Sequence, residues 1–308
     1  MNYTAMGIVL TTKCGATCDH CCFSCTPKSA ISLPYDLVIS CIRGTARIPE
    51  ISQIGFTGGE PFLLYDQLVE YVAEATKNGK TSTVVTNCQW ASEYEVAYSH
   101  INKLKKAGLV GIGISYDGFH HKYIPITNVG NVIKAAKRLG LAVKVQAAIL
   151  GDTKIGHAVD ELLPYIVDAD LSFFACQPVG RAKEKFASNR FIRDTPSCGG
   201  FCRKSGTFSI GPDGTVFPCC VPYAIETELS PGNIYDMSIE DIYRSLENNV
   251  YLKLLRNNGF DYFIRIAEKY LDIRIPEKVI SPCEICALLF SSKNFYKFLP
   301  YLRKEEAL

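Results

Sequence analysis

Short apolar, β-branched runs alternate with longer amphipathic stretches over about the first 180 residues of the chain. This alternation is typical of repeated strand–helix units around a parallel sheet. Strands are predicted at residues 6–11, 51–57, 82–86, 110–115, 142–149 and 171–176. Helical periodicity between them predicts helices at residues 35–47, 63–78, 93–107, 129–139 and 157–167, with glycine soon after several of them as a stop signal.

Six such units, rather than eight, predict an α/β fold with an open, partial (β/α)6 barrel of the TIM type. In parallel α/β sheets the chemistry takes place at the carboxyl ends of the strands. The residues that follow each predicted strand are therefore the first candidates for an active site.

The pattern changes near residue 190, where cysteines, glycines and a further amphipathic helix replace the strand–helix units. We therefore expect a core domain over residues 1–190 and a small cysteine-rich domain over residues 191–308. Pro212, Asp213 and Gly214 predict the turn of a β-hairpin, because this composition favours tight reversals of the chain. A helix is predicted from about residue 239 to 255.

The composition excludes some classes of protein but leaves the predicted fold unchanged. The chain has 308 residues, a formal net charge of +2 and no long basic run, which disfavours a nucleic-acid partner. No signal peptide begins it, and no apolar stretch reaches the ~18 residues that a membrane span needs. We expect a cytoplasmic protein that does not bind membranes. Its 14 cysteines are then expected to be reduced thiolates that serve as metal ligands.

Three of these cysteines, Cys14, Cys18 and Cys21, follow the first predicted strand at spacings of four and three residues. A structural zinc site would need two close pairs, whereas the nearest further thiol, Cys22, is adjacent to Cys21. A four-iron cubane normally takes four cysteines, so three would leave one iron open to a small molecule. Zinc or a disulfide remains the alternative.

This triplet, together with Gly58-Gly59-Glu60-Pro61 after the second predicted strand, resembles the radical S-adenosylmethionine enzymes. The resemblance implies that the open iron of a [4Fe–4S] cluster binds S-adenosylmethionine and that a 5′-deoxyadenosyl radical abstracts hydrogen from a substrate. It also implies that the Gly-Gly-Glu-Pro loop holds the methionine amino group. Glycines allow a close backbone approach, and a glutamate can accept from an ammonium.

Further positions at the strand ends resemble the cofactor-binding stations of the same superfamily. The resemblance implies that the methionine, ribose or adenine groups contact residues after the third to sixth strands and one residue within the cysteine triplet: Asn87, Ser115, Asp117, Gln146, Arg181 and His20. Asn87 and Asp117 could instead hydrogen-bond loop backbone, and Arg181 could be an ordinary surface residue. His20 is expected to pack beside the adenine rather than to carry protons.

Cys202, Cys219 and the pair Cys283-x-x-Cys286 resemble the twitch module, an abbreviated SPASM domain that holds an auxiliary cluster. The resemblance implies one auxiliary [4Fe–4S] cluster with these four ligands, and Cys198 is the alternative to Cys202. A zinc ribbon that uses the same four thiolates remains open.

Cys220 then has no role in either cluster, although it is adjacent to Cys219. In the peptide epimerases that this chain resembles, a thiol returns hydrogen to a Cα radical from the face opposite to abstraction, and Cys220 is the candidate donor. It could equally be a packed cysteine. Other thiols also compete for the role of donor: Cys22, Cys25, Cys88 and Cys176.

The resemblance therefore predicts a radical S-adenosylmethionine enzyme that acts on a ribosomally synthesised peptide, by L-to-D epimerisation at Cα. A crosslinking maturase forming thioether or C–C bonds, and a small-molecule dehydrogenase whose auxiliary cluster accepts an electron, are the alternatives. A metal-binding module without catalysis would leave the Gly-Gly-Glu-Pro loop unexplained. The expected partners are a precursor peptide and a reducing donor such as flavodoxin or ferredoxin.

Overall fold

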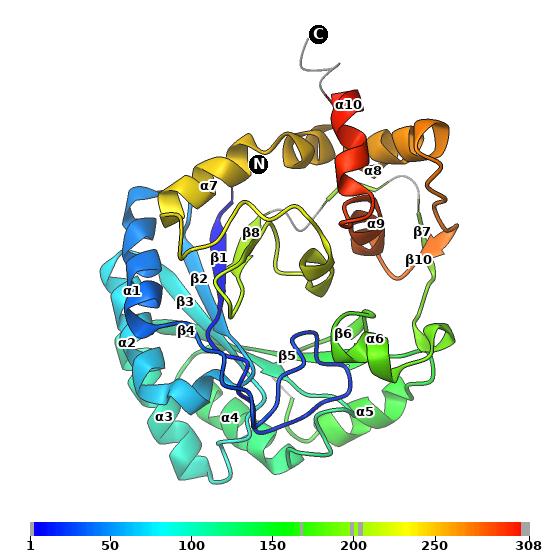
Figure 1. Ribbon diagram of the computed structural model, residues 1–308. Helices are drawn as coiled ribbons and strands as arrows, with labels where there is room; N and C mark the ends of the chain where they lie inside the picture. The colour runs from blue at the N-terminus through cyan, green and yellow to red at the C-terminus, as the bar shows by residue number, and fades with distance from the viewer. Residues whose placement is uncertain (1–2, 167–168, 198–199, 203–205, 303–308) are drawn as a thin grey trace.

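A curved sheet of eight strands, in the order β6-β5-β4-β3-β2-β1-β8-β9, organises the protein (Figure 1). This computed structural model describes residues 3–166, 169–197, 200–202 and 206–302. Neighbouring strands from β1 to β6 are parallel. The strands are β1 (Ala5–Val9), β2 (Gln53–Thr57), β3 (Thr81–Thr86), β4 (Leu109–Ser115), β5 (Ala142–Ile149), β6 (Asp170–Ala175), β8 (Thr207–Ile210) and β9 (Val216–Phe217), with β7 (Thr195–Pro196) and β10 (Lys278–Val279) in a separate antiparallel pair.

The six predicted strands are all present, and the expected open, partial barrel is confirmed. Their boundaries move by only a few residues, because buried apolar side chains set each strand in register with its neighbours. The first strand ends at Val9 rather than at residue 11, and Thr11 instead forms an isolated bridge to Ser32. The loop that carries the first three cysteines therefore begins directly after Val9.

Helices α1 to α5 cover the outer face of the sheet, as strand–helix units require (Figure 1). The expected helix at 157–167 begins and ends earlier, and residues 167–168 lie outside the described part of the chain. No helix in the described residues is both long and apolar enough to cross a membrane. The helices are α1 (Tyr35–Gly44), α2 (Tyr65–Lys77), α3 (Tyr94–Ala107), α4 (Ile126–Arg138), α5 (Ile155–Leu162), α6 (Arg181–Lys185), α7 (Ile239–Asn248), α8 (Val250–Tyr270), α9 (Pro282–Leu289) and α10 (Leu299–Leu302).

The hairpin of the cysteine-rich segment extends the same sheet. β8 lies parallel to β1, with Ala5 opposite Thr207 and Ile8 opposite Ile210, and β9 returns antiparallel to β8. The predicted turn is present, and Gly214 adopts a φ of +82° that suits glycine. The cysteines after β9 are therefore carried to the open side of the barrel by a strand that continues its sheet.

The predicted helix at 239–255 is two helices. α7 ends at Asn248, and the Asn249 side chain caps α8 by accepting a hydrogen bond from the Leu252 N–H at 3.1 Å. α8 changes direction at Gly259, where φ is +72°. Its buried residues share one continuous core with the strands of the barrel, which holds α9 and its two cysteines next to the sheet.

Candidate active site

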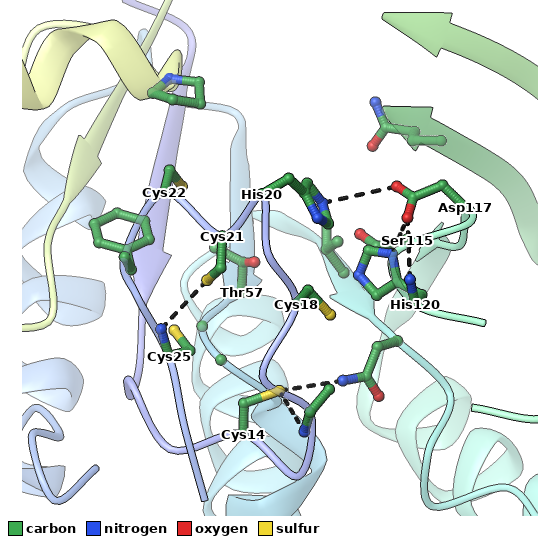
Figure 2. A pocket seen from close by; sticks show the side chains of 18 of the residues that line it. Cys14, Cys18, His20, Cys21, Cys22, Cys25, Thr57, Ser115, Asp117 and His120 are labelled. Carbon is green, nitrogen blue, oxygen red and sulfur yellow. Dashed lines mark hydrogen bonds and ion pairs between the residues drawn. The ribbon is translucent and has the colours of Figure 1, made fainter. Parts of the chain in front are cut away.

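Cys14, Cys18 and Cys21 lie in the loop of residues 10–34 after β1, which we call the cysteine loop. All three line one cavity of about 230 Å³ at the carboxyl ends of the strands (Figure 2). The structure thus brings together the three predicted ligands of the first cluster. Burial raises the pKa of Cys14 to about 11, so its thiolate is costly until a cationic metal centre binds it.

Backbone and side-chain N–H groups point at two of these sulfur atoms. The Asn87 Nδ2 and the Ala16 N–H donate to Cys14 Sγ at 3.3 and 3.4 Å, and the Cys25 N–H donates to Cys21 Sγ at 3.3 Å. Such donors stabilise negative charge on sulfur and are a feature of thiolate-bound iron–sulfur clusters. The donor set therefore fits a cluster held by three thiolates.

The Gly58-Gly59 pair packs directly against the cysteine loop. A Cβ at Gly59 would lie 2.4 Å from the Lys13 carbonyl oxygen, and one at Gly58 would lie 2.8 Å from that of Thr11. The Gly59 N–H donates to the Thr11 carbonyl at 2.6 Å, and the Glu60 N–H donates to the Lys13 carbonyl at 2.9 Å. Glycine is needed here because any side chain would push the two loops apart.

The Glu60 side chain turns away from the cavity and is 1% exposed. Its carboxylate accepts hydrogen bonds from the Thr86 hydroxyl at 2.9 and 3.0 Å, the Asn87 N–H at 2.8 Å and the Phe62 N–H at 3.1 Å. Burial raises the pKa of Glu60 to about 7. Gly58 and Gly59 line the cavity, whereas Glu60 and Pro61 do not, so Glu60 joins its own loop to the end of β3.

Three further predicted residues line the same cavity. Asn87 follows β3, Ser115 ends β4, and Gln146 lies opposite Ser115 on β5. Their side chains come together because the carboxyl ends of adjacent parallel strands meet at one edge of the sheet. These positions offer amide and hydroxyl groups to a bound small molecule.

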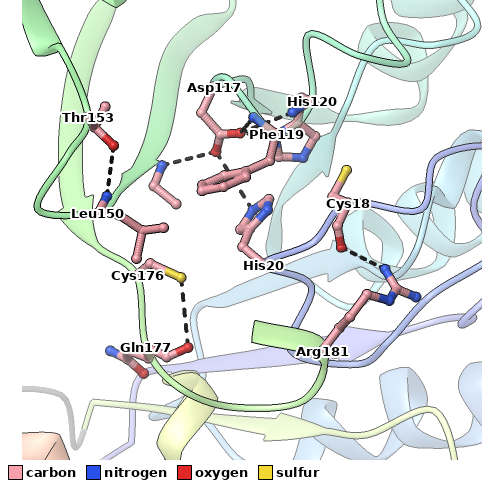
Figure 3. A network of polar contacts seen from close by, with 11 residues as sticks. Cys18, His20, Asp117, Phe119, His120, Leu150, Thr153, Cys176, Gln177 and Arg181 are labelled. Atoms are coloured by element: carbon pink, nitrogen blue, oxygen red, sulfur yellow. Dashed lines mark hydrogen bonds and ion pairs between the residues drawn. The ribbon is translucent and has the colours of Figure 1, made fainter. Parts of the chain in front are cut away.

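Asp117 lies between two imidazoles in the cavity wall (Figure 3). Its carboxylate accepts from His120 Nδ1 at 2.8 Å and from the Ala148 N–H at 3.0 Å, and His20 Nε2 is 3.7 Å away. Burial acts to raise the pKa of Asp117, but the His120 imidazole and these hydrogen bonds outweigh it and hold the pKa at about 2. Burial lowers the pKa of His20 to about 4, so this ring is neutral near pH 7.

The ring of His20 stacks on Phe119 at a centroid distance of 4.7 Å. Its Nδ1 is buried and has no hydrogen-bond partner among the described residues. The ring also lines the cavity, so it can offer a flat surface to a planar group bound there. Asp117 therefore holds the side chains of this wall in place, and its carboxylate is not free to bind another group.

Arg181 begins α6, and the residue is 8% exposed. It donates to the Cys18 and Cys25 carbonyl oxygens at 2.6 and 2.7 Å, and the Arg181 N–H donates to the Cys21 carbonyl at 3.0 Å. Arg181 is therefore neither a surface residue nor a lining residue of the cavity. The structure assigns it to holding the cysteine loop in shape.

Several residues of the cavity were not expected as cofactor contacts. Cys176, Phe174 and Gln177 come from the end of β6, and His120 from the loop after β4. The rule that chemistry lies at the strand ends could have identified Cys176 and Gln177. His120 and Cys22, which also lines the cavity, are placed there only by loop conformation.

The second predicted ligand set also comes together. Cys202, Cys219 and Cys286 border one small cavity of about 30 Å³. Burial raises the pKa of Cys286, and the charges of neighbouring thiols, Cys283 among them, raise it further. Cys198, the alternative to Cys202, lies outside the described residues. Four thiols thus come together from three segments: the residues before β8, the residues after β9, and α9.

Arg256, from α8, borders the same small cavity. Its Nε and Nη2 are buried and have no hydrogen-bond partner among the described residues, and its guanidinium lies 4.7 Å from the Tyr3 ring centroid. Buried arginine N–H groups without a partner are costly. A cluster with anionic sulfur ligands would satisfy them, so the residues present fit such a group.

Cys220 is exposed and lines neither of these two cavities. The next two residues along the chain line larger cavities. Val221 lines a second cavity, and Pro222 lines the cavity of the cysteine loop. Cys220 therefore lies at the rim of the open side of the barrel.

Comparison with known proteins agrees with this geometry. Residues 8–154 match the radical SAM superfamily, and residues 198–287 match the iron–sulfur cluster-binding SPASM domain. The chain is 27% identical, over 97% of its length and 96% of the relative's, to the putative peptide biosynthesis protein YydG of Bacillus subtilis.

Two solved structures share the fold. The native anSMEcpe structure with bound AdoMet and Cp18Cys peptide has a TM-score of 0.59 at 16% identity and covers 98% of both chains. The structure of Streptococcus suis SuiB bound to precursor peptide SuiA has a TM-score of 0.59 at 12% identity and covers 83% of this chain and 67% of SuiB.

Residues 8–154 thus form a radical SAM domain, and residues 198–287 form a SPASM domain. The cofactors of the chain are S-adenosylmethionine and two [4Fe–4S] clusters. The cysteine loop fits the cluster that binds S-adenosylmethionine, and the four converging thiols with Arg256 fit the auxiliary one.

Proposed function

We propose that this enzyme epimerises residues of a ribosomally synthesised peptide from L to D at Cα, with Cys220 as the hydrogen donor. The observation that supports this most is the place of Cys220. It is exposed, it is not needed as a cluster ligand, and Val221 and Pro222 connect it to both large cavities on the open side of the barrel.

The peptide substrate is supported by the relatives. YydG, which aligns over nearly the whole chain, is named a putative peptide biosynthesis protein, and both solved structures named above contain a peptide. A peptide also fits an active-site cavity that remains open on one side of a partial barrel. The electron donor in this proposal is a low-potential flavodoxin or ferredoxin.

S-adenosylmethionine, once bound, supplies the 5′-deoxyadenosyl radical that removes the Cα hydrogen. The residues of this chain do the rest. Gly58 and Gly59 let the backbone approach the methionine group closely, and His20 offers a flat, neutral surface to the adenine. Gln146 and Ser115 offer polar groups on the facing strands. These contacts hold the reacting group on one face of the peptide.

Cys220 would complete the reaction from the other face. Its S–H bond breaks as a new Cα–H bond forms, which inverts the centre and leaves a sulfur radical on Cys220. One electron from the reduced flavodoxin or ferredoxin and one proton from solvent restore the thiol. The exposure of Cys220 suits both the approach of the peptide and exchange of its proton with water.

An anaerobic turnover in deuterium oxide tests this proposal. The reaction would contain reductant, S-adenosylmethionine and the synthetic product of any short open reading frame beside this gene. Epimerisation predicts the gain of a single deuterium per modified residue, because the Cys220 thiol exchanges with solvent. Loss of a pair of hydrogens would instead mean net oxidation, and a crosslinking maturase or a dehydrogenase would replace the epimerase.

The role of Cys220 has its own test. Cys220→Ala should still release 5′-deoxyadenosine and abstract hydrogen but form no D-residue. Cys176→Ala is the matched control, since Cys176 is a competing thiol that lines the cavity. Normal D-residue formation by Cys220→Ala, with loss of it in Cys176→Ala, would move the donor role to Cys176.

A further inference from the structure

A second cavity of about 570 Å³ lies between the end of β6 and the β7–β10 pair. Phe174 and Ala175 of β6 border it on one side, and Thr195 and Pro196 of β7 on the other. Its volume is within the range of ligand sites. In Figure 1, β6 and the β7–β10 pair lie on the side of the molecule away from β1 and β2.

The lining of this cavity is mostly apolar and is uncharged. Among its described lining residues are Phe201, Phe260 and Pro282, and none of the described lining residues carries a charge. Phe201 is 58% exposed, so its ring offers apolar surface to an occupant of the cavity. An occupant with an aliphatic or aromatic side chain therefore suits the cavity.

One polar group in the lining lacks a partner. Ser281 precedes α9, yet its hydroxyl does not cap that helix. The Ser281 Oγ is buried and has no hydrogen-bond partner among the described residues. An unpartnered buried hydroxyl costs free energy, which a peptide amide or carbonyl in the cavity would recover.

The free edge of β6 borders the same space. In the sheet formed by the described strands, β6 is terminal and pairs only with β5. The Cys176 N–H donates to the Ile149 carbonyl at 2.8 Å, which directs the backbone groups of Cys176 toward β5. Because the direction alternates along a strand, the N–H and C=O groups of Leu171, Phe173 and Ala175 point to the free edge.

This cavity adjoins the active site. Phe174 and Gln177 line both cavities. Cys202 and Cys283, two of the predicted auxiliary ligands, also line the second one, and Val221 places it next to Cys220. A chain that runs along β6 therefore passes from the auxiliary cysteines to the cavity of the cysteine loop.

We infer that the precursor peptide binds here as an added strand on the free edge of β6, with an apolar side chain in the cavity between β6 and the β7–β10 pair. This inference rests on the proposed function, since the occupant is its peptide substrate. Strand addition uses main-chain hydrogen bonds for affinity and pockets for alternate side chains for selectivity. The unpaired edge and the apolar cavity supply these two elements.

A proline substitution tests the strand pairing. Phe173→Pro removes an N–H that faces the free edge, where proline is tolerated, and Phe173→Ala loses the same side chain but keeps that N–H. The enzyme with both clusters and S-adenosylmethionine would be titrated into a fluorescein-labelled form of the synthetic peptide used in the turnover experiment. Phe173→Pro should bind about 3- to 10-fold more weakly than Phe173→Ala.

A peptide series tests the same pairing without changing the enzyme, so misfolding cannot confuse the result. Each backbone nitrogen of the peptide would be methylated in turn. Strand addition predicts that affinity falls at every second residue of one segment and that replacing one apolar side chain there by Asp abolishes binding. Equal losses at adjacent positions would overturn the added strand.

The outcomes separate the two proposals. If the parent enzyme binds and modifies the peptide but the methylation series shows no period of two, and Phe173→Pro matches Phe173→Ala, strand addition is wrong and the peptide function stands. If the parent enzyme binds no peptide, both are wrong. If the peptide is bound with period two but oxidised, strand addition stands and epimerisation is wrong.

Discussion

The guanidinium of Arg181 donates a 2.6 Å hydrogen bond to the backbone carbonyl of Cys18, in the middle of the cysteine loop. A second bond, to the Cys25 carbonyl, makes the side chain a bridge between two turns of that loop. A residue at the exit of β6 thus shapes a loop that begins after β1. The loop can present three thiols only while this distant strand is in place.

Arg181→Met should therefore destabilise the cysteine loop. The two carbonyls would lose their charged donor while still largely buried, and we expect the free energy of unfolding to fall by about 2–4 kcal/mol. Anaerobic chemical denaturation and iron content would be measured together. Arg190→Met, at a more exposed arginine paired with Asp152, is the control and should change little. An unchanged stability for Arg181→Met would contradict the bridging role.

Asn87→Ala should make the reduction potential of the first cluster more negative. The Asn87 Nδ2 donates to Cys14 Sγ at 3.3 Å, and such bonds stabilise the reduced, more negative state. A bond of about 1 kcal/mol corresponds to roughly 40 mV for one electron. A redox titration followed by electron paramagnetic resonance measures it. Asn128→Ala is the control, because the Asn128 amide donates to the Cys88 and Gln89 carbonyls instead.

Glu60 should make stability depend on pH. Burial raises its pKa in the folded protein to about 7, against about 4.3 for an unfolded glutamate. The folded state then holds the extra proton, so the free energy of unfolding falls as the pH rises from about 4.3 to about 7, on the order of 3 kcal/mol in total.

Glu60→Gln should flatten that slope, and denaturation of the cluster-containing protein between about pH 5.5 and 8 measures it. Glu95→Gln, at an exposed glutamate in the first turn of α3, should retain the parental slope. Identical slopes for the parent and Glu60→Gln would show that Glu60 does not titrate in this range.

Cys219→Ala and Cys220→Ala differ by one position and should differ in iron content. Cys219 borders the small cavity with Cys202 and Cys286, whereas Cys220 is exposed. We expect Cys219→Ala to lose about half of the iron, since one of two cubanes loses a ligand, and Cys220→Ala to keep all of it. Iron loss in Cys220→Ala would make Cys220 a ligand and remove it from hydrogen donation.

The sequence by itself determined the elements and the thiol chemistry. Alternating apolar runs specify strands through local burial, so β1 to β6 were predicted within a few residues, and the Pro212–Gly214 turn identified the hairpin. The spacing of Cys14, Cys18 and Cys21 is a local property that survives in any fold. The resemblance to radical S-adenosylmethionine enzymes identified Asn87, Ser115 and Gln146, which the structure brings together in one cavity.

Only the tertiary structure decided what individual side chains do. Glu60 faces Thr86 rather than the cavity, and Arg181 faces the carbonyls of the cysteine loop, because loops far apart in sequence pack there. The parallel pairing of β8 with β1 and the free edge of β6 likewise arise from long-range contacts. A linear pattern records which residues are apolar or polar, but the direction of a side chain depends on neighbours that only folding brings together.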